Sequence, residues 1–287
     1  MDLTSPKTIK SLLKDHHLWA KKRLGQHFLI CKNVLDKITN SAQLSKKDLV
    51  LEIGPGIGVL TKELCPRAKK VIACELDKKM VEILRETCGQ FKNLKIINED
   101  ILKVNLAQSP ELQAQSYKIV ANLPYQITSP VLWKFLHYEK KKPQEMILMV
   151  QKEVAARICT NPPDMNLLSV MVQFYGKPKI ITEVGKNCFW PCPEVTSAVI
   201  KISDIKDEQS EVADEKLFFR IVKAGFSQKR KQLKNSLAAG LNLDIKENLK
   251  ILEEIGINPQ RRAETLNLED WKKLYFCLRK FKIRKGR

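Results

Sequence analysis

Short β-branched runs alternate with stretches of helical spacing between Leu49 and about Ile202, and this alternation constrains the fold more than any other feature. It is typical of βαβ units, in which helices connect the parallel strands of one sheet. The strands we expect are Leu49 to Ile53, Lys70 to Glu75, Leu94 to Asn98, Tyr117 to Ala121, Glu145 to Val150, Lys179 to Val184 and Ser197 to Ile202. Only a loop separates the last two, which predicts an antiparallel hairpin closing the sheet. The expected class is α/β, with a Rossmann-like seven-stranded sheet.

The chain changes character after this region. Residues 204–215 are polar and acidic without periodicity, which indicates a linker. Beyond it, apolar residues recur at helical spacing and predict a small all-helical C-terminal domain over residues 216–287. Residues 1–22 are interpreted as a basic N-terminal arm, so that the sheet domain covers residues 23–203.

Composition excludes several classes of protein. The 287 residues are 44% hydrophobic and contain no apolar run near the roughly 20 residues of a membrane helix. A secretory signal is not expected, since Asp2 and Asp15 occupy the first residues and no apolar segment follows. The eight cysteines are scattered without a C-x-x-C pair, so neither a metal nor disulfides are expected. We expect a cytoplasmic protein without membrane contact.

Positive charge is in large excess. Lys and Arg number 51 against 32 Asp and Glu, a formal net charge of +19, and the segment from Arg220 to Arg287 alone carries 18 basic and 7 acidic residues. A nucleic-acid backbone is the partner that such charge fits. A solvated basic face explains the charge about equally well, so other motifs must decide.

A glycine-rich loop, Glu52-Ile53-Gly54-Pro55-Gly56-Ile57-Gly58, follows the first expected strand and precedes a helix. Glycines there let the backbone turn tightly and approach a ligand. Glu75 ends the second strand, where a carboxylate can bind a ribose diol, and Asp100 ends the third, where it can accept from a ring amine. This set favours an adenosine-containing cofactor. A nicotinamide dehydrogenase uses a related loop, but its glycine spacing is G-x-G-x-x-G.

The tetrapeptide Asn122-Leu123-Pro124-Tyr125 follows the fourth strand and fits methyl transfer to a planar amine. The lone pair of such an amine is delocalised into its ring. If the Asn122 oxygen and a carbonyl of Leu123 or Pro124 accept the two N–H bonds, the nitrogen can become pyramidal and face a sulfonium methyl. Pro124 stiffens the turn. Tyr125 offers a ring on which a flipped base can stack.

A second ring is needed to enclose such a base. Phe189 in the proline-rich loop before the last strand is the candidate, and Trp190 is the less favoured alternative. Together these motifs predict an S-adenosylmethionine-dependent methyltransferase domain in which Asn122, Leu123, Pro124, Tyr125 and Phe189 are catalytic.

From about Lys21 to about Tyr275 the chain resembles the KsgA (RsmA) family of small-subunit rRNA adenine dimethyltransferases. The matching segments are Lys22 to Leu29, Glu52 to Gly58, Asn122 to Pro130, Val150 to Ala155, Phe226 to Lys231 and Arg261 to Glu264. The resemblance implies N6,N6-dimethylation of two adjacent adenosines in the 3′-terminal hairpin of 16S-type rRNA, within an immature small ribosomal subunit. We expect the protein to be a monomer.

The resemblance assigns cofactor contacts to six residues: His27, Leu29, Gly54, Glu75, Asp100 and Asn122. Gly56 and Ile101 are also expected to bind the cofactor, which gives eight residues in all. Three residues depart from the family pattern. His27 stands where many relatives have Asn, Cys192 replaces a Pro, and Glu194 replaces a frequent Lys. The first affects how the cofactor is contacted, and the other two affect how the loop binds RNA.

Six basic residues of the helical domain are the expected RNA contacts: Lys229, Arg230, Lys231, Lys234, Arg261 and Arg262. Phosphate contacts of this kind position the substrate without reading its sequence.

Three alternatives remain open. A macrolide-resistance methyltransferase of large-subunit rRNA has a similar tetrapeptide, but the segments around Phe226 and Arg261 favour the small-subunit enzyme. DNA adenine methyltransferases more often carry Pro-Pro-Tyr after Asp or Asn. The chain could instead be a non-catalytic ribosome-assembly or transcription factor, which the intact tetrapeptide disfavours.

Overall fold

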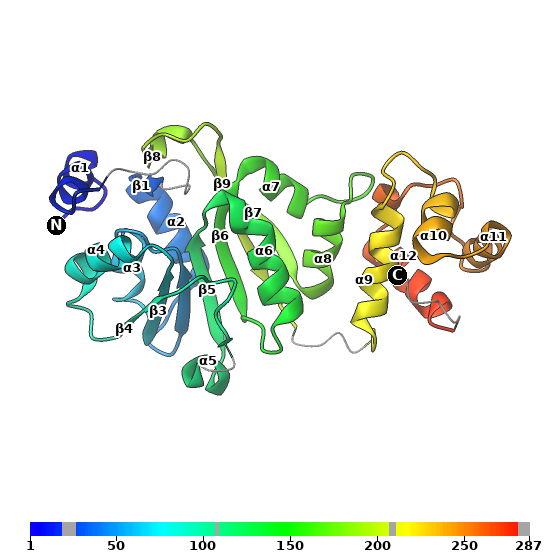
Figure 1. Cartoon of the computed structure of the whole chain (residues 1–287), viewed down its shortest axis with the longest axis horizontal. Helices are drawn as coiled ribbons and strands as arrows, with labels where there is room; N and C mark the ends of the chain where they lie inside the picture. Colours follow the sequence, from blue (N-terminus) through cyan, green and yellow to red (C-terminus); the bar gives the residue numbers. More distant parts are fainter. Residues whose placement is uncertain (19–26, 107–108, 207–210, 281–287) are drawn as a thin grey trace. The chain divides into compact units, whose positions relative to one another are not determined.

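The computed structural model describes residues 1–18, 27–106, 109–206 and 211–280. The chain forms two compact units, which are described separately (Figure 1). The sheet unit comprises Met1–Ala156 and Gly176–Asp207, and the helical unit comprises Arg157–Tyr175 and Glu208–Arg287. The domain boundaries expected at residues 23, 204 and 216 stay a proposal.

The sheet unit is built on a seven-stranded sheet of order β4-β3-β2-β5-β6-β9-β7. Its strands are β2 (Leu49–Ile53), β3 (Lys70–Glu75), β4 (Leu94–Asn98), β5 (Tyr117–Asn122), β6 (Glu145–Gln151), β7 (Lys177–Val184) and β9 (Ser197–Ser203). Strand β9 runs antiparallel to both of its neighbours, β6 and β7, while the other pairs are parallel. The Rossmann-like sheet with a closing hairpin is therefore confirmed.

Helices cover the faces of the sheet because its central strands are apolar on both sides. Every residue of β2 is buried, as expected of a strand between two helical layers. The helices of this unit are α2 (Lys32–Ala42), α3 (Thr61–Leu64), α4 (Lys78–Cys88), α5 (Pro110–Ala114) and α6 (Thr128–Trp133), which continues into η4 (Lys134–Tyr138). The carboxyl ends of β2, β3, β4 and β5 share one edge, where such folds bind ligands.

The expected N-terminal arm contains a docked helix, α1 (Pro6–Asp15), that begins at a Ser5 cap. Ile9, Leu12 and Leu13 lie one helical turn apart and are buried in the core of the sheet unit. Burial of this apolar stripe stabilises the helix on the sheet unit, so this part of the chain is not a free arm. The remaining arm residues, 19–22, lie outside the described residues.

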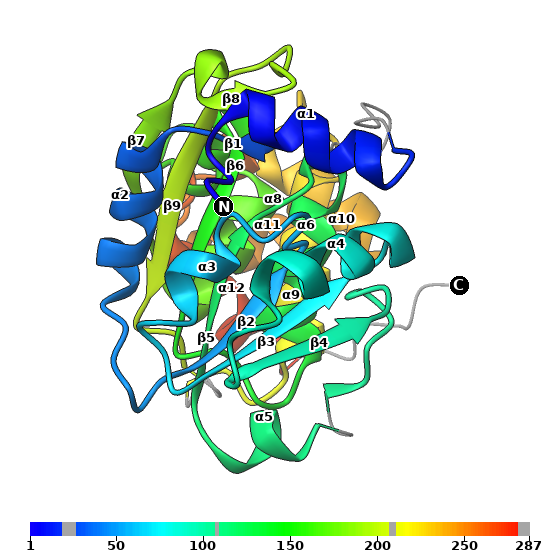
Figure 2. The ribbon, with the colours of Figure 1, turned by 90° about the vertical axis from the view of Figure 1, so that its left-hand side faces the viewer.

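A two-stranded ribbon adjoins α1 in the same unit. Strand β1 (Phe28–Leu29) pairs antiparallel with β8 (Phe189–Trp190), so that Phe28 faces Trp190 and Leu29 faces Phe189. Figure 2 shows α1 beside this pair. The ribbon joins the chain before α2 to the proline-rich loop between β7 and β9, two segments that are distant in the sequence.

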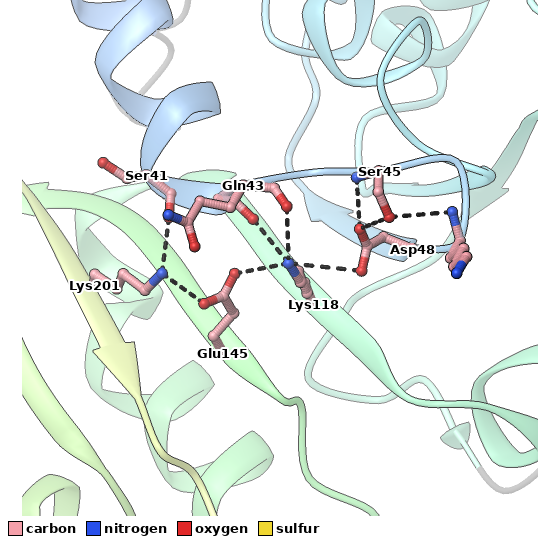
Figure 3. A network of polar contacts seen from close by, with 9 residues as sticks. Ser41, Gln43, Ser45, Asp48, Lys118, Glu145 and Lys201 are labelled. Carbon is pink, nitrogen blue, oxygen red and sulfur yellow. Dashed lines mark hydrogen bonds and ion pairs between the residues drawn. The ribbon is translucent and has the colours of Figure 1, made fainter.

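Helix α2 is fastened to the sheet by a polar network (Figure 3). Lys118 on β5 donates to the Ala42 carbonyl at 2.9 Å and pairs with Glu145 at 3.1 Å and Asp48 at 3.6 Å. Lys201 on β9 pairs with the same glutamate at 2.7 Å and donates to the Ser41 carbonyl at 2.9 Å. The two lysines thus satisfy carbonyls that the end of a helix leaves unpaired.

The helical unit contains α8 (Leu167–Tyr175), α9 (Glu215–Phe226), α10 (Leu233–Leu241), α11 (Ile245–Glu254) and α12 (Leu268–Leu278). An aromatic cluster fills its core, with the Phe174 ring stacked on Phe218 at 4.5 Å between centroids. Helices α9 and α10 pack closely because Gly240 meets Ala224, where an added Cβ would lie 2.5 Å from the alanine methyl. Helix α7 (Lys152–Ile158) ends inside this unit. None of the described helices combines the length and apolar character that a bilayer crossing requires.

Candidate active site

A cavity of about 600 Å³ opens at the carboxyl edge of the sheet. Its volume falls in the range of small-molecule sites. Its walls come from β1, the glycine-rich loop after β2, the ends of β3 and β4, and the segment after β5. All eight residues expected to contact the cofactor line it, together with the rest of the tetrapeptide: His27, Leu29, Gly54, Gly56, Glu75, Asp100, Ile101 and Asn122, with Leu123, Pro124 and Tyr125.

The glycine-rich loop leaves room for a ligand because two of its residues have no side chain. Neither of these glycines can be replaced without strain. Gly54 and Gly56 have φ of +66° and +57°, in the left-handed region that favours glycine. A Cβ on Gly54 would lie 3.4 Å from Pro124, and one on Gly56 would lie 3.4 Å from the Phe28 ring. A Cβ at either position would contact a wall of the cavity, and the positive φ would strain any residue other than glycine there.

Glu75 is a nearly buried carboxylate at the end of β3. One oxygen accepts from the Gly56 N–H at 3.0 Å, and the other accepts from the Asp77 N–H at 2.9 Å. Burial raises the pKa of Glu75, although these hydrogen bonds oppose the shift. The two bonds fix the carboxylate at the cavity wall, in the position expected of a group that binds a ribose diol.

The chain after β3 and β4 brings one acid and two apolar side chains to the cavity. Asp100 lies after β4, and its carboxylate accepts from the Leu102 N–H at 2.9 Å. Ile101 beside it is buried, whereas Leu76, directly after Glu75, is 65% exposed and also lines the cavity. A planar ring that enters between such apolar side chains would remove them from water.

Asn122 ends β5 with its side chain oriented by a distant segment. Its Nδ2 donates to the His27 carbonyl at 3.3 Å, which leaves Oδ1 as the acceptor end of the amide. The Pro124 carbonyl already accepts from the Ile127 N–H at 3.1 Å, at the start of the η3 turn (Tyr125–Ile127). The Leu123 carbonyl, which accepts from none of the described groups, is therefore the better second acceptor for an amine.

Tyr125 is held from two sides. Its hydroxyl and the Ser197 hydroxyl are 2.6 Å apart, and the His27 ring lies nearly parallel to its ring, with centroids 6.3 Å apart. His27 Nδ1 is in turn 2.7 Å from the Pro191 carbonyl and donates to it. His27 therefore connects Asn122, Tyr125 and the proline-rich loop.

Phe189 is not among the residues that line the cavity. Its side chain is buried in the core beside β1, and the neighbouring Trp190 is partly exposed and stacks on Phe28 with centroids 6.5 Å apart. Phe189 pairs with Leu29 across the two-stranded ribbon, and Leu29 lines the cavity, so Phe189 is next to a residue of the cavity wall. Its role as a base-stacking residue stays a prediction.

The six basic residues expected to bind RNA belong to the helical unit, outside this cavity. Lys229, Arg230 and Lys231 lie exposed in the turn that precedes α10, and Lys234 is in the first turn of that helix. Arg261 is held by Thr265 and pairs with Asp270 at 3.2 Å. The adjacent Arg262 is exposed and lies 3.8 Å from Glu264.

Sequence reasoning missed several residues of the site. Leu76 could have been noticed as an apolar residue between two acids at a strand end, and Phe28 as part of the segment that includes His27 and Leu29. Ser197 and Pro191 offered no signal, because their contacts with Tyr125 and His27 join residues 72 and 164 positions apart. Within the described part of the chain, no three His, Cys, Asp or Glu side chains gather to hold a metal ion.

Comparisons with known proteins agree with this geometry. The family model described as ribosomal RNA adenine dimethylase matches residues 18–279. A ribosomal RNA small subunit methyltransferase A from Dehalococcoides mccartyi is 47% identical over 272 residues, which are 94% of this chain and 91% of the relative. The enzyme of the same name from Alkaliphilus oremlandii is 40% identical over 277 residues, 94% of this chain and 95% of the relative.

Solved structures show the same fold. A dimethyladenosine transferase from Plasmodium falciparum matches with a TM-score of 0.76 and 28% identity, over 88% of this chain and 97% of that one. The 23S rRNA methyltransferase ErmE shares the fold with a TM-score of 0.69 and 23% identity, over 88% of this chain and 99% of that one. The resemblance found in the sequence is confirmed: this chain belongs to the ribosomal RNA adenine dimethylase family.

Proposed function

We propose that the protein transfers methyl groups from S-adenosylmethionine to the N6 amines of two adjacent adenosines in the 3′-terminal hairpin of 16S-type rRNA. It is an rRNA adenine dimethyltransferase, like the small-subunit methyltransferases to which it is similar. The orientation of the Asn122 side chain is the observation that most directly supports amine methylation. Asn122 stands at the cavity wall with its amide nitrogen engaged by His27 and its oxygen available, directly before Leu123, Pro124 and Tyr125.

The cavity fits S-adenosylmethionine. Gly54 and Gly56 keep a cradle open that a Cβ would narrow, and Glu75 presents a fixed carboxylate for a ribose diol. Leu76 and Ile101 would contact the adenine ring, with Asp100 accepting from its amine. When bound, the cofactor supplies a methyl group made electrophilic by a sulfonium centre.

The chain's own residues prepare the nucleophile. The Asn122 Oδ1 and the Leu123 carbonyl accept the two N–H bonds of the target amine, which holds the nitrogen pyramidal and directs its lone pair. Tyr125 stacks on the flipped adenine, and Phe189 is proposed to cover the opposite face. No general base is required, because the methylated amine is acidic and releases its proton to water.

The rRNA is bound within an immature small ribosomal subunit, in the cytoplasm, by a monomer. The basic residues Lys229, Arg230, Lys231, Lys234, Arg261 and Arg262 contact its phosphates.

Mapping of transferred methyl groups tests the proposal. The protein is incubated with S-adenosylmethionine carrying a labelled methyl group and with undermethylated small subunits, and the modified nucleotides are located. We expect two labelled methyl groups on each of two adjacent adenosines. Label in large-subunit rRNA, with macrolide resistance in cells, would instead indicate the alternative enzyme, and absence of label would overturn the assignment.

Asn122→Ala separates catalysis from binding. We expect a fall in kcat of roughly 10²- to 10³-fold, the usual cost of losing one such hydrogen-bonding group, with unchanged affinity for the subunit. Asn122→Asp is the matched control because it keeps the acceptor and loses the donor to His27, so it should retain more activity. A non-catalytic assembly factor would tolerate both variants in a subunit-maturation assay.

A further inference from the structure

Helix α1 has two chemically different faces. Ile9, Leu12 and Leu13 are buried in the core, whereas Lys7, Lys10 and Lys14 are exposed on the opposite side. The lysines recur at i, i+3 and i+7, which aligns them along one stripe about 10 Å long at the rise of an α-helix. The apolar face accounts for docking of the helix on the sheet unit, and it does not account for the lysines.

The lysine stripe lies next to the proline-rich loop. The Lys10 ammonium is 5.7 Å from the centre of the Trp190 ring, on the strand that also carries Phe189. Trp190 stacks on Phe28, which lines the cavity. The Trp190 ring therefore connects Lys10 to Phe28 at the cavity wall.

Contacts at the ends of α1 fix its orientation. His16, after the last turn, is 2.7 Å from Glu86 on α4, and Lys62 on α3 donates to the Met1 carbonyl at 2.7 Å. None of the three stripe lysines forms an ion pair with a described residue, and the nearest acid on the helix, Asp15, accepts from Ser11 at 3.5 Å. A positioned row of uncompensated cations beside a binding site attracts a polyanion.

We infer that Lys7, Lys10 and Lys14 form a phosphate-binding surface for the rRNA substrate. They contact the RNA backbone that flanks the target adenosines. This inference rests on the proposed function and adds a second RNA contact in the sheet unit itself. The family model begins to match at residue 18, so α1 precedes the region by which the family is defined. The partner is RNA rather than a protein, because the stripe holds charges that suit phosphates, whereas the isoleucine and leucine side chains of the helix are all buried.

Salt dependence of binding tests the inference in the full chain. The variant K7Q/K10Q/K14Q removes three charges, and the slope of log affinity against log salt should fall by about one for each phosphate that is no longer neutralised. We expect a slope smaller by about three and affinity for undermethylated small subunits weaker by on the order of 10- to 100-fold near 0.1 M salt. Affinity for S-adenosylmethionine should not change, and the Tm should fall only slightly, since the substituted side chains are exposed and only Lys10 contacts a ring, that of Trp190.

The control variant K46Q/K47Q/K92Q removes three exposed lysines from loops before β2 and β4, at the edge of the sheet opposite the cavity. It should leave the slope unchanged. Equal slopes for the two variants and the wild type, with methylation intact, would overturn the inference and leave the proposed function standing. A wild-type protein that neither binds nor methylates small subunits would overturn the proposed function instead.

Vesicles provide a further comparison. Phosphatidylglycerol vesicles present a different polyanion, and we expect the α1 substitutions to affect rRNA binding more than co-sedimentation with such vesicles. Loss of vesicle binding with an unchanged rRNA slope would assign the stripe to a membrane surface and contradict the inference.

Discussion

Glu52, at the residue scale, is a buried acid beside the cofactor cavity. Its carboxylate is 1% exposed and accepts from the Thr61 hydroxyl at 2.7 Å. Burial raises the pKa of Glu52 from 4.5 to about 8, with Thr61 opposing the shift and the nearby Glu75 adding to it. Near pH 7 the folded protein therefore holds most of this side chain as the neutral acid.

The raised pKa predicts a loss of stability with rising pH. Between pH 4.5 and about 8 the folded protein binds more protons at Glu52 than the unfolded chain, so the free energy of unfolding falls through this window. Glu52→Gln should flatten that dependence, leaving the Tm nearly unchanged at pH 5 and raising it at pH 8. Thermal unfolding without cofactor, measured across this range, gives the comparison.

Glu82→Gln is the matched control, since Glu82 is an exposed residue of α4. Its Tm profile should follow that of the wild type. If Glu52→Gln and Glu82→Gln lose stability in parallel between pH 5 and pH 8, Glu52 is not the titrating group.

Single residues also show how much of the site the sequence could reveal. Glu75, Asp100 and Asn122 were predicted together because each ends a parallel strand, and such ends share one edge. Leu76 was missed although it lies between two acids at a strand end, because a single apolar residue there does not by itself indicate a cavity wall. The link from His27 to Pro191 depends on the pairing of β1 with β8, which no spacing along the chain encodes.

The polar network of Figure 3, at the scale of elements, determines how α2 lies on the sheet. The Lys118 side chain is only 9% exposed and joins the helix end to β5 and β6. Lys118→Met should lower the free energy of unfolding by roughly 3 to 5 kcal/mol, because it leaves buried acids and helix carbonyls without their partner. Chemical denaturation, with the midpoint and slope both fitted, measures the change.

Lys95→Met offers a comparison on the edge strand β4 of the same sheet. Lys95 is 43% exposed and pairs with Glu111, which keeps a second partner in Lys70. Its loss should cost at most about 1 kcal/mol, as for other surface ion pairs. Similar losses in the two variants would show that the network around Lys118 contributes no more than a surface pair.

Elements differed in how well the sequence predicted them. The strands of the sheet were located within two residues at each end, because apolar runs bounded by turns are a strong local signal. Helix α2 was not predicted, although its buried residues, among them Val34, Leu35 and Ile38, recur at helical spacing. Helix α1 belongs to the predicted N-terminal arm, although Ile9, Leu12 and Leu13 recur at helical spacing. Strands β1 and β8 are two residues long and arise from tertiary pairing.

The excess of basic residues is a property of the whole molecule, and the structure shows which of the expected RNA contacts also stabilise the fold. Arg261 donates to Thr265 and pairs with Asp270 inside the helical unit, so its removal would destabilise that unit. Lys229, Arg230 and Lys231 lie exposed in a turn and form no ion pair with a described residue. Only the second group should affect RNA binding without affecting the Tm.

The variant K229Q/R230Q/K231Q should therefore reduce the salt slope of subunit binding by about three with no change in Tm, while Arg261→Gln lowers the Tm. If α1 and this turn contact separate phosphates, each surface releases its own counterions, and a variant that combines both triple substitutions should lose the sum of the two slopes. Binding measured from about 0.05 to 0.3 M salt gives the slopes of the wild type, the two triple variants and the combined variant. A combined loss no larger than that of one triple variant would mean that the two surfaces do not contact the same RNA at the same time.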